Sequence, residues 1–139
     1  MILLDTNIVV DALDKDQAYH SWSKKQIEDA LAGDGGGISV VTLAELCAGA
    51  REPEGMEPEI KRLGITVHDV PVAVAAICGK AYRRYGAARR DSGGSAPPKM
   101  PLPDFFIGAQ AEIMGWNIAT RDQERFKRYF PKVTLVTPS

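Results

Sequence analysis

The sequence predicts an α/β protein, a three-layer α/β/α sandwich around a largely parallel central sheet. One observation on the sequence and one general rule of sheet topology lead to this prediction. Short apolar runs alternate along the chain with longer segments in which apolar residues recur every three or four positions, the spacing of a helix packed on one side. Strands that are separated by helices pair in parallel, and the helices then cover both faces of the sheet.

The first strand and two helices are expected before the glycine-rich run at residues 33–37. Ile2–Leu4 is a short aliphatic run, typical of a strand buried on both faces. Asp5 ends this run, and a short helix is expected from Asn7 to Leu13. A second helix is expected from Gln17 to Ala32, because its apolar residues fall on one side and the glycines then end it.

The middle of the chain repeats the alternation of strand and helix. Ile38–Val41 is the next expected strand, and Thr42 begins another helix. After a turn at Arg51–Gly55, we expect a helix over Met56–Leu63 and a half-exposed strand over Ile65–Val70.

A long helix is expected to begin at Pro71, because proline suits the first turn of a helix. Its buried stripe has helical spacing and consists of Val74, Ile77, Cys78, Ala81 and Tyr85. The segment Asp91–Pro103 is rich in glycine, serine and proline and is expected to be a loop. The last elements are a helix, a strand, a helix and a strand, at Asp104–Met114, Trp116–Ala119, Asp122–Phe130 and Val133–Val136.

Composition and charge narrow the class of protein. The 139 residues contain no internal repeat or linker, so we expect a single domain over residues 1–139. No apolar run approaches the roughly 18 residues of a membrane span, and the N-terminus has no secretory pattern, so a cytoplasmic protein is expected.

Cys47 and Cys78 are expected to be thiols rather than a disulfide. The net charge of -1 leaves only a local patch for contact with nucleic acid.

Four of the eighteen acidic residues stand out by their positions. Asp5, Glu45 and Asp122 each follow the carboxyl end of an expected strand, and Asp104 begins a helix. In a parallel α/β sheet, such positions converge on one edge. Each acid taken alone has a simpler interpretation. The three aspartates suit helix N-caps, worth about 1 kcal/mol each, and Thr42 with Glu45 matches a capping box.

Taken together, the four acids are better explained by chemistry, because caps do not require an acid at every strand exit. Converging carboxylates repel one another, and a divalent cation relieves that repulsion. Oxygen ligands select Mg²⁺ or Mn²⁺ over zinc, and His20 and His68 are not spaced as a pair of zinc ligands. Such a site acts mostly on phosphates, by polarising a phosphoryl oxygen and activating a water molecule.

Four segments carry a resemblance to a known family: LLDTNIVVD, SVVTLAELCAG, PLPDFFIGAQAEIMGWNIATRDQERF and VTLVTP. Over these segments the chain resembles the PIN-domain ribonucleases, specifically the VapC-type toxins of bacterial toxin–antitoxin pairs. The family's catalytic and metal-binding acids map onto Asp5, Glu45, Asp104 and Asp122. Its supporting polar residues match Thr6, Asn7 and Thr120, which turn and cap chemistry explains equally well. One departure is Arg125, where many relatives carry a further acid.

The resemblance implies a PIN-like fold and a Mg²⁺- or Mn²⁺-dependent endoribonuclease. This enzyme cleaves RNA through a metal-activated water, with tRNA and rRNA as candidate substrates. The resemblance also implies a homodimer and neutralisation by a cognate antitoxin. Two alternatives stay open: a housekeeping nuclease in RNA processing, and a non-catalytic module that binds RNA or protein. A phosphatase that uses Asp5 as its nucleophile is disfavoured, because Asn7 stands where a second aspartate is needed.

Two surfaces are candidates for binding RNA and the antitoxin. The candidates for RNA binding are Arg83, Arg84, Arg89 and Arg90, interleaved with Tyr82 and Tyr85. A solvated helix face explains the same arginines. For the antitoxin, the resemblance points to the region Ile8–Leu31, with Trp22 as the strongest candidate for contact, although core packing explains its apolar residues equally well.

Overall fold

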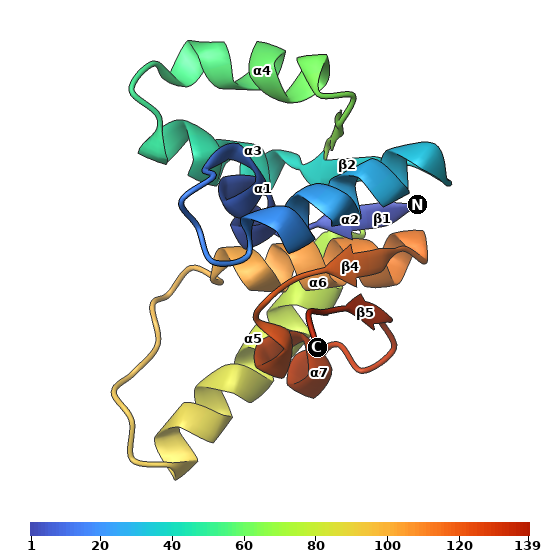
Figure 1. The fold of residues 1–139 in the computed structure, drawn as a ribbon. Helices are drawn as coiled ribbons and strands as arrows, with labels where there is room; N and C mark the ends of the chain where they lie inside the picture. Colours follow the sequence, from blue (N-terminus) through green and yellow to red (C-terminus); the bar gives the residue numbers. More distant parts are fainter.

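A central sheet of five parallel strands organises the fold (Figure 1). The computed structural model describes all residues from Met1 to Ser139. Its strands are β1 (Ile2–Leu4), β2 (Gly36–Ser39), β3 (Thr66–His68), β4 (Asn117–Ala119) and β5 (Leu135–Val136). They lie in the order β3-β2-β1-β4-β5, and every neighbouring pair is parallel. The predicted α/β class is confirmed, and β1 is the central strand.

Helices cover both faces of the sheet, as a three-layer sandwich requires (Figure 1). One face carries α1 (Thr6–Leu13), α2 (His20–Ala32), α3 (Val40–Gly49) and α4 (Met56–Arg62). The other face carries α5 (Val74–Asp91), α6 (Pro103–Met114) and α7 (Gln123–Tyr129). A short 3₁₀ turn at Pro53–Gly55 links α3 to α4.

Neighbouring residues of β1 supply the two hydrophobic cores. Leu3 packs into the core beneath α5, α6 and α7, and Leu4 packs into the core beneath the other helices. Both leucines are fully buried, which stabilises the fold by about 1.5–3 kcal/mol for each side chain. Side chains of a strand alternate between its faces, so the pair ties both layers to the central strand. Asp5 therefore directly follows the central strand, which is packed on both faces.

The transition from β2 to α3 differs from the sequence prediction. The strand was expected to include Val40 and Val41, but both valines belong to the first turn of α3. Ser39 is the N-cap, and its hydroxyl oxygen accepts a hydrogen bond of 3.2 Å from the Val41 amide. This serine cap overrides the strand preference of the valines, because it satisfies an amide that the helix leaves unpaired. The predicted capping box at Thr42 is therefore wrong.

The long helix α5 also differs in its ends and in its buried stripe. It begins at Val74 rather than at Pro71, and it extends to Asp91, so the loop that follows spans residues 92–102. Within the predicted stripe, Val74, Cys78 and Ala81 are buried and Ile77 and Tyr85 are half-buried. Tyr82 is buried as well, and its hydroxyl donates a hydrogen bond of 2.6 Å to the Pro98 carbonyl. This bond anchors the loop to the helix.

Several other boundaries lie a few residues from those expected, the largest change being that α2 begins at His20 rather than Gln17. Frayed helix ends and short strands make such shifts common. Cys47 and Cys78 are free thiols, as expected. None of the helices has both the length and the apolar character that crossing a membrane requires.

Candidate active site

The four acids selected from the sequence line one cavity at the carboxyl edge of the sheet. The cavity has a volume of about 330 Å³ and is lined by Asp5, Thr6, Asn7, Val10, Glu45, Asp104, Arg121 and Asp122. These residues come from the exit of β1, from α1 and α3, from the first turn of α6 and from the turn after β4. The convergence expected of a parallel sheet is therefore present.

Asp5 is the most enclosed of the four acids, with 4% of its surface exposed. Its backbone amide donates to the Ala119 carbonyl at 3.0 Å, which extends the pairing of β1 with β4. One carboxylate oxygen accepts from the Thr6 amide at 2.8 Å and caps α1. The other accepts from the Thr120 hydroxyl at 2.7 Å and from the Asn7 amide group at 3.2 Å. Asp5 is thus both a cap and a carboxylate fixed at the cavity wall.

Burial raises the pKa of Asp5 from 3.8 to about 6. The hydrogen bond from Thr120 opposes this rise, and the negative charges of Asp104 and Glu45 add to it. The two acids lie close enough to act on Asp5 through their charge. The cavity therefore brings several negative charges close together.

Glu45 reaches the cavity from α3 and is exposed to solvent. Its carboxylate accepts a hydrogen bond of 2.7 Å from the Thr6 hydroxyl, which lies at the start of α1. The bond joins two helices that follow neighbouring strands. Glu45 does not act as the capping-box partner of Thr42, because Ser39 begins α3.

Asp104 is the second residue of α6, after Pro103, and it lies in the first turn rather than at the N-cap. An anion is favoured there by the dipole of the helix. One of its carboxylate oxygens accepts from Nη1 of Arg125 at 3.1 Å. Burial raises the pKa of Asp104, the Arg125 guanidinium opposes that rise, and the charge of Asp122 adds to it.

Asp122 occupies the N-cap position of α7, but its side chain makes no capping hydrogen bond. Its backbone amide donates instead to the Thr120 hydroxyl at 3.0 Å. Asp122 is exposed and borders the cavity. The capping interpretation is therefore wrong for this carboxylate, which remains available to a ligand.

The donor set suits a hard divalent cation, because all of its groups are carboxylate, hydroxyl or amide oxygens. Burial is the main cause of the raised pKa values of Asp5 and Asp104, and a cation would offset the repulsion between acids that adds to them. In their present positions, no group of three or more histidine, cysteine or acidic side chains is arranged to hold a metal ion. Magnesium commonly keeps several of its waters, so a site of this kind does not require all four acids to touch the ion.

A partly buried ion pair at the cavity was not predicted from the sequence. Asp11 of α1 is 1% exposed, and its carboxylate accepts from Nε and Nη2 of Arg121 at 2.5 and 3.2 Å. Ser23 of α2 donates to the same carboxylate at 3.3 Å. The Arg121 amide donates to the side chain of Asn7 at 3.3 Å, and its guanidinium lies 5.3 Å from the ring centre of Tyr19. The only sequence signal was the position of Arg121 between two candidate site residues.

The four arginines suggested for RNA binding lie on the second half of α5. Arg84 donates to the Tyr129 carbonyl at 3.1 Å. Arg89 donates to Ser95 and to the Tyr85 hydroxyl, each at 2.9 Å. Two members of the group therefore have partners within the protein, whereas Arg83 and Arg90 are exposed.

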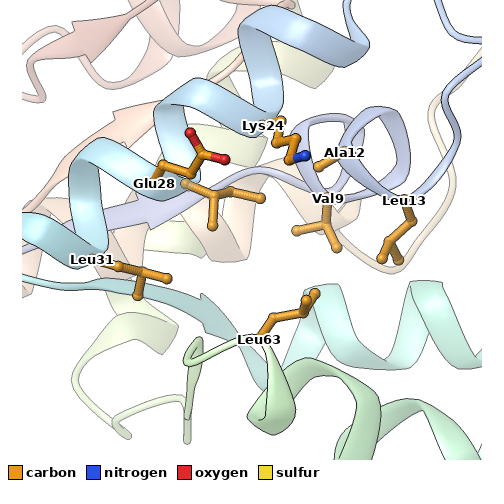
Figure 2. Close-up of a pocket in the computed structure, with 8 residues that line it drawn as sticks. Val9, Ala12, Leu13, Lys24, Glu28, Leu31 and Leu63 are labelled. Carbon is orange, nitrogen blue, oxygen red and sulfur yellow. The ribbon is translucent and has the colours of Figure 1, made fainter.

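An apolar groove lies between α1, α2 and the end of α4 (Figure 2). Its volume is about 180 Å³, and its lining consists of Val9, Ala12, Leu13, Lys24, Ile27, Glu28, Leu31 and Leu63. Trp22, the residue suggested for antitoxin contact, is half-buried against the nearby core and is not part of this lining.

Several solved structures are similar to this chain over almost its whole length, among them the following three. VapBC2 from Rickettsia felis, bound to a DNA fragment from its promoter, has a TM-score of 0.67 and 21% identity, with 100% of both chains covered. VapC20 from Mycobacterium tuberculosis, a sarcin-ricin loop cleaving toxin, has a TM-score of 0.59 and 18% identity, with 96% of this chain and 99% of that chain covered. VapBC-5 from Mycobacterium tuberculosis, a member of the VapBC family of toxin-antitoxin systems, has a TM-score of 0.57 and 19% identity, with 98% and 97% covered.

Sequence comparison identifies the family independently of the shared fold. No curated protein matches the sequence. The family model of the PIN domain, however, matches residues 2–130, which include all four acids and every element from β1 to α7. This protein therefore belongs to the PIN domain family.

Proposed function

We propose that the protein is a metal-dependent endoribonuclease that acts as the toxin of a toxin–antitoxin pair. The observation that carries this proposal is the convergence of Asp5, Glu45, Asp104 and Asp122 on one cavity. Membership of the PIN domain family supports nuclease chemistry. Similarity to VapC20, a sarcin-ricin loop cleaving toxin, and to the VapBC-5 toxin-antitoxin system supports RNA as the substrate and an antitoxin as the partner.

The four carboxylates are the proposed ligands of Mg²⁺ or Mn²⁺, directly or through water. When bound, the ion would lower the pKa of a water molecule and offset the negative charge on the cleaved phosphate. Thr6 and Thr120 hold the carboxylates of Glu45 and Asp5 at 2.7 Å. Ligands that are held by such bonds lose little freedom on binding the ion, which favours a defined site.

The RNA is proposed to approach along the basic half of α5. Arg84 and Arg89 already use some of their N–H donors in hydrogen bonds within the protein, which favours Arg83 and Arg90 as contacts to phosphate. For the antitoxin, we propose the surface of α1 and α2, with the apolar groove of Figure 2 at its centre. Trp22, which packs against the core on the same side of the sheet, stays the predicted contact residue. A homodimer remains a prediction of the family resemblance.

The enzymatic proposal is tested by incubating the purified protein with total RNA in EDTA, Mg²⁺ or Mn²⁺. We expect cleavage only with the divalent ions, and a loss of at least about a hundredfold in the Asp5→Asn variant. That variant keeps the size of the side chain and changes only its charge and one donor group. Equal cleavage by wild type and variant would mean that a contaminating nuclease acts and would remove the proposal.

The toxin role needs a separate test, because a housekeeping nuclease would also cleave RNA. Induced expression of the chain in a bacterial host is expected to stop growth, whereas Asp5→Asn expressed at the same level is not. Arrest by both proteins would point to a binding module rather than an enzyme. Normal growth with active wild-type enzyme would favour the housekeeping role.

A further inference from the structure

One arginine forms an ion pair with an acid of the cavity. Arg125 of α7 pairs with Asp104 of α6, and this is the sole ion pair formed by Asp5, Glu45, Asp104 or Asp122. Arg121, the arginine that lines the cavity, is engaged by the buried carboxylate of Asp11. Arg125 is therefore the immediate counter-ion of the acid cluster.

The packing around Arg125 holds its guanidinium in place. Its Nη1 lies 3.1 Å from a carboxylate oxygen of Asp104, and the two side chains are only 31% and 25% exposed. The guanidinium carbon lies 5.2 Å from the ring centre of Tyr85 and 5.8 Å from that of Phe105. Cation–π contacts and partial burial reduce the freedom of the arginine to leave its partner.

Charge explains why the pair matters for a metal. Asp104 is partly buried and also faces the negative charge of Asp122, so its ionised form needs a nearby positive charge. Arg125 supplies one in the protein without metal. A divalent cation at the same carboxylate would meet the guanidinium at short range, and two cations that share a carboxylate repel each other. The ion must therefore displace Arg125 or bind against its charge.

We propose that Arg125 is an internal counter-ion that competes with the divalent metal for Asp104. This inference rests on the metal site of the proposed function. In the metal-free protein, Arg125 keeps the acid cluster partly neutralised. When the metal binds, the guanidinium of Arg125 leaves Asp104. Breaking this ion pair lowers the affinity of the protein for the metal.

The test compares Mn²⁺ affinity of wild type, Arg125→Gln and Arg128→Gln, measured on metal-free protein by the electron paramagnetic resonance signal of free Mn²⁺. Arg128 is the matched control, because it lies one turn further along α7, carries the same charge and pairs with none of the four acids. We expect Arg125→Gln to bind Mn²⁺ roughly five- to tenfold more tightly, the effect of removing a partly exposed ion pair. Arg128→Gln and the charge-retaining Arg125→Lys should stay within about twofold of wild type.

Thermal unfolding supplies a second measurement that does not depend on activity. In EDTA, Arg125→Gln should unfold at a lower temperature than wild type, because Asp104 loses its partner. Saturating Mn²⁺ should raise the midpoint more in the variant than in wild type, since no ion pair has to be broken.

Each other outcome overturns a defined statement. Unchanged or weaker Mn²⁺ binding by Arg125→Gln, with normal binding by wild type, would overturn the competition while leaving the metal site intact. A gain of the same size in Arg128→Gln would attribute the effect to net charge rather than to the pair. Absence of Mn²⁺ binding in every protein would overturn this inference and the metal dependence of the proposed function together.

Discussion

At the scale of one residue, Asp5 shows how a buried acid changes the free energy of unfolding with pH. It is almost completely buried, and burial raises its pKa to about 6 against an ordinary 3.8. Between about pH 4 and pH 6, the native protein therefore binds more protons at this residue than the unfolded chain does. The contribution of Asp5 to the free energy of unfolding is fully present below about pH 4 and is lost as the pH rises through about 6. Near neutral pH, the ionised side chain lowers the stability of the metal-free protein.

The Asp5→Asn variant should accordingly be more stable than wild type at pH 7.5 in EDTA, by about 1–2 kcal/mol. Asparagine removes the buried charge and its repulsion by Asp104 and Glu45, although it exchanges one acceptor for a donor. At pH 4.5 the difference should largely disappear, because Asp5 is then mostly protonated in the native protein. Urea unfolding at the two pH values measures both effects. A variant that is less stable than wild type at pH 7.5 would show that the hydrogen bonds of Asp5 outweigh the cost of its charge.

The convergence of the four acids was predictable from the sequence, whereas the ion pairs that arginines form in and beside the cavity were not. Residue type and place after a strand are local properties, and they selected Asp5, Glu45, Asp104 and Asp122. The partners depend on contacts between distant segments. Arg125 lies 21 residues from Asp104, and Arg121 lies 110 residues from Asp11. Nothing in one sequence shows which of several nearby arginines will turn toward which acid.

At the scale of elements, the order of helices and strands was predictable and several boundaries were not. Apolar spacing reports the face that an element buries, which is a property of many residues together. A boundary depends instead on one cap, and Ser39 made Val40 and Val41 helical against their strand preference. Similarly, Thr42 and Glu45 fit a capping box only if Thr42 is the N-cap of α3. The N-cap is Ser39, three residues earlier.

The packing of α6 against the end of α7 gives a prediction at this scale. Gly108 lies inside α6, and a β-carbon built on it would overlap the buried ring of Phe130. Alanine normally stabilises a helix interior relative to glycine by about 0.8–1 kcal/mol. Here we expect Gly108→Ala to destabilise the protein by about 1–3 kcal/mol, because a rigid ring cannot move away without disturbing the core.

The control for this prediction is Gly79→Ala in α5. Gly79 is also inside a helix, but a β-carbon at this position meets nothing within 4 Å. This variant should gain about 0.5–1 kcal/mol, so urea unfolding should give opposite signs for the two glycines. Similar effects for both would mean that helix propensity, rather than contact with Phe130, sets the result.

At the scale of the whole molecule, the candidate site is a product of the parallel sheet. The central strand β1 pairs on one side with β2 and on the other with β4, so its exit lies beside the exits of both neighbours. Residues from the beginning and the end of the chain are thereby joined, as in the contact between Asp5 and Thr120. The sequence order of strands and helices was enough to predict this edge, because the rule depends on topology rather than on exact boundaries.

The Asp11–Arg121 ion pair holds the same two ends together behind the cavity, and it gives a prediction for the molecule as a whole. Arg121→Gln would leave the carboxylate of Asp11 buried without its cation. We expect a loss of about 2–4 kcal/mol in the free energy of unfolding, somewhat less than for a fully buried pair because Arg121 is 34% exposed. Lys25→Gln is the control, since it breaks a pair with Asp29 that is more than half exposed and worth less than about 0.5 kcal/mol.

The double variant Asp11→Asn with Arg121→Gln separates the burial of a charge from the loss of a contact. Without the carboxylate, no unpaired charge remains in the core, so the double variant should be more stable than Arg121→Gln alone. If Arg121→Gln costs no more stability than Lys25→Gln, solvent must reach Asp11 in solution, and the pair does not tie the two ends of the chain.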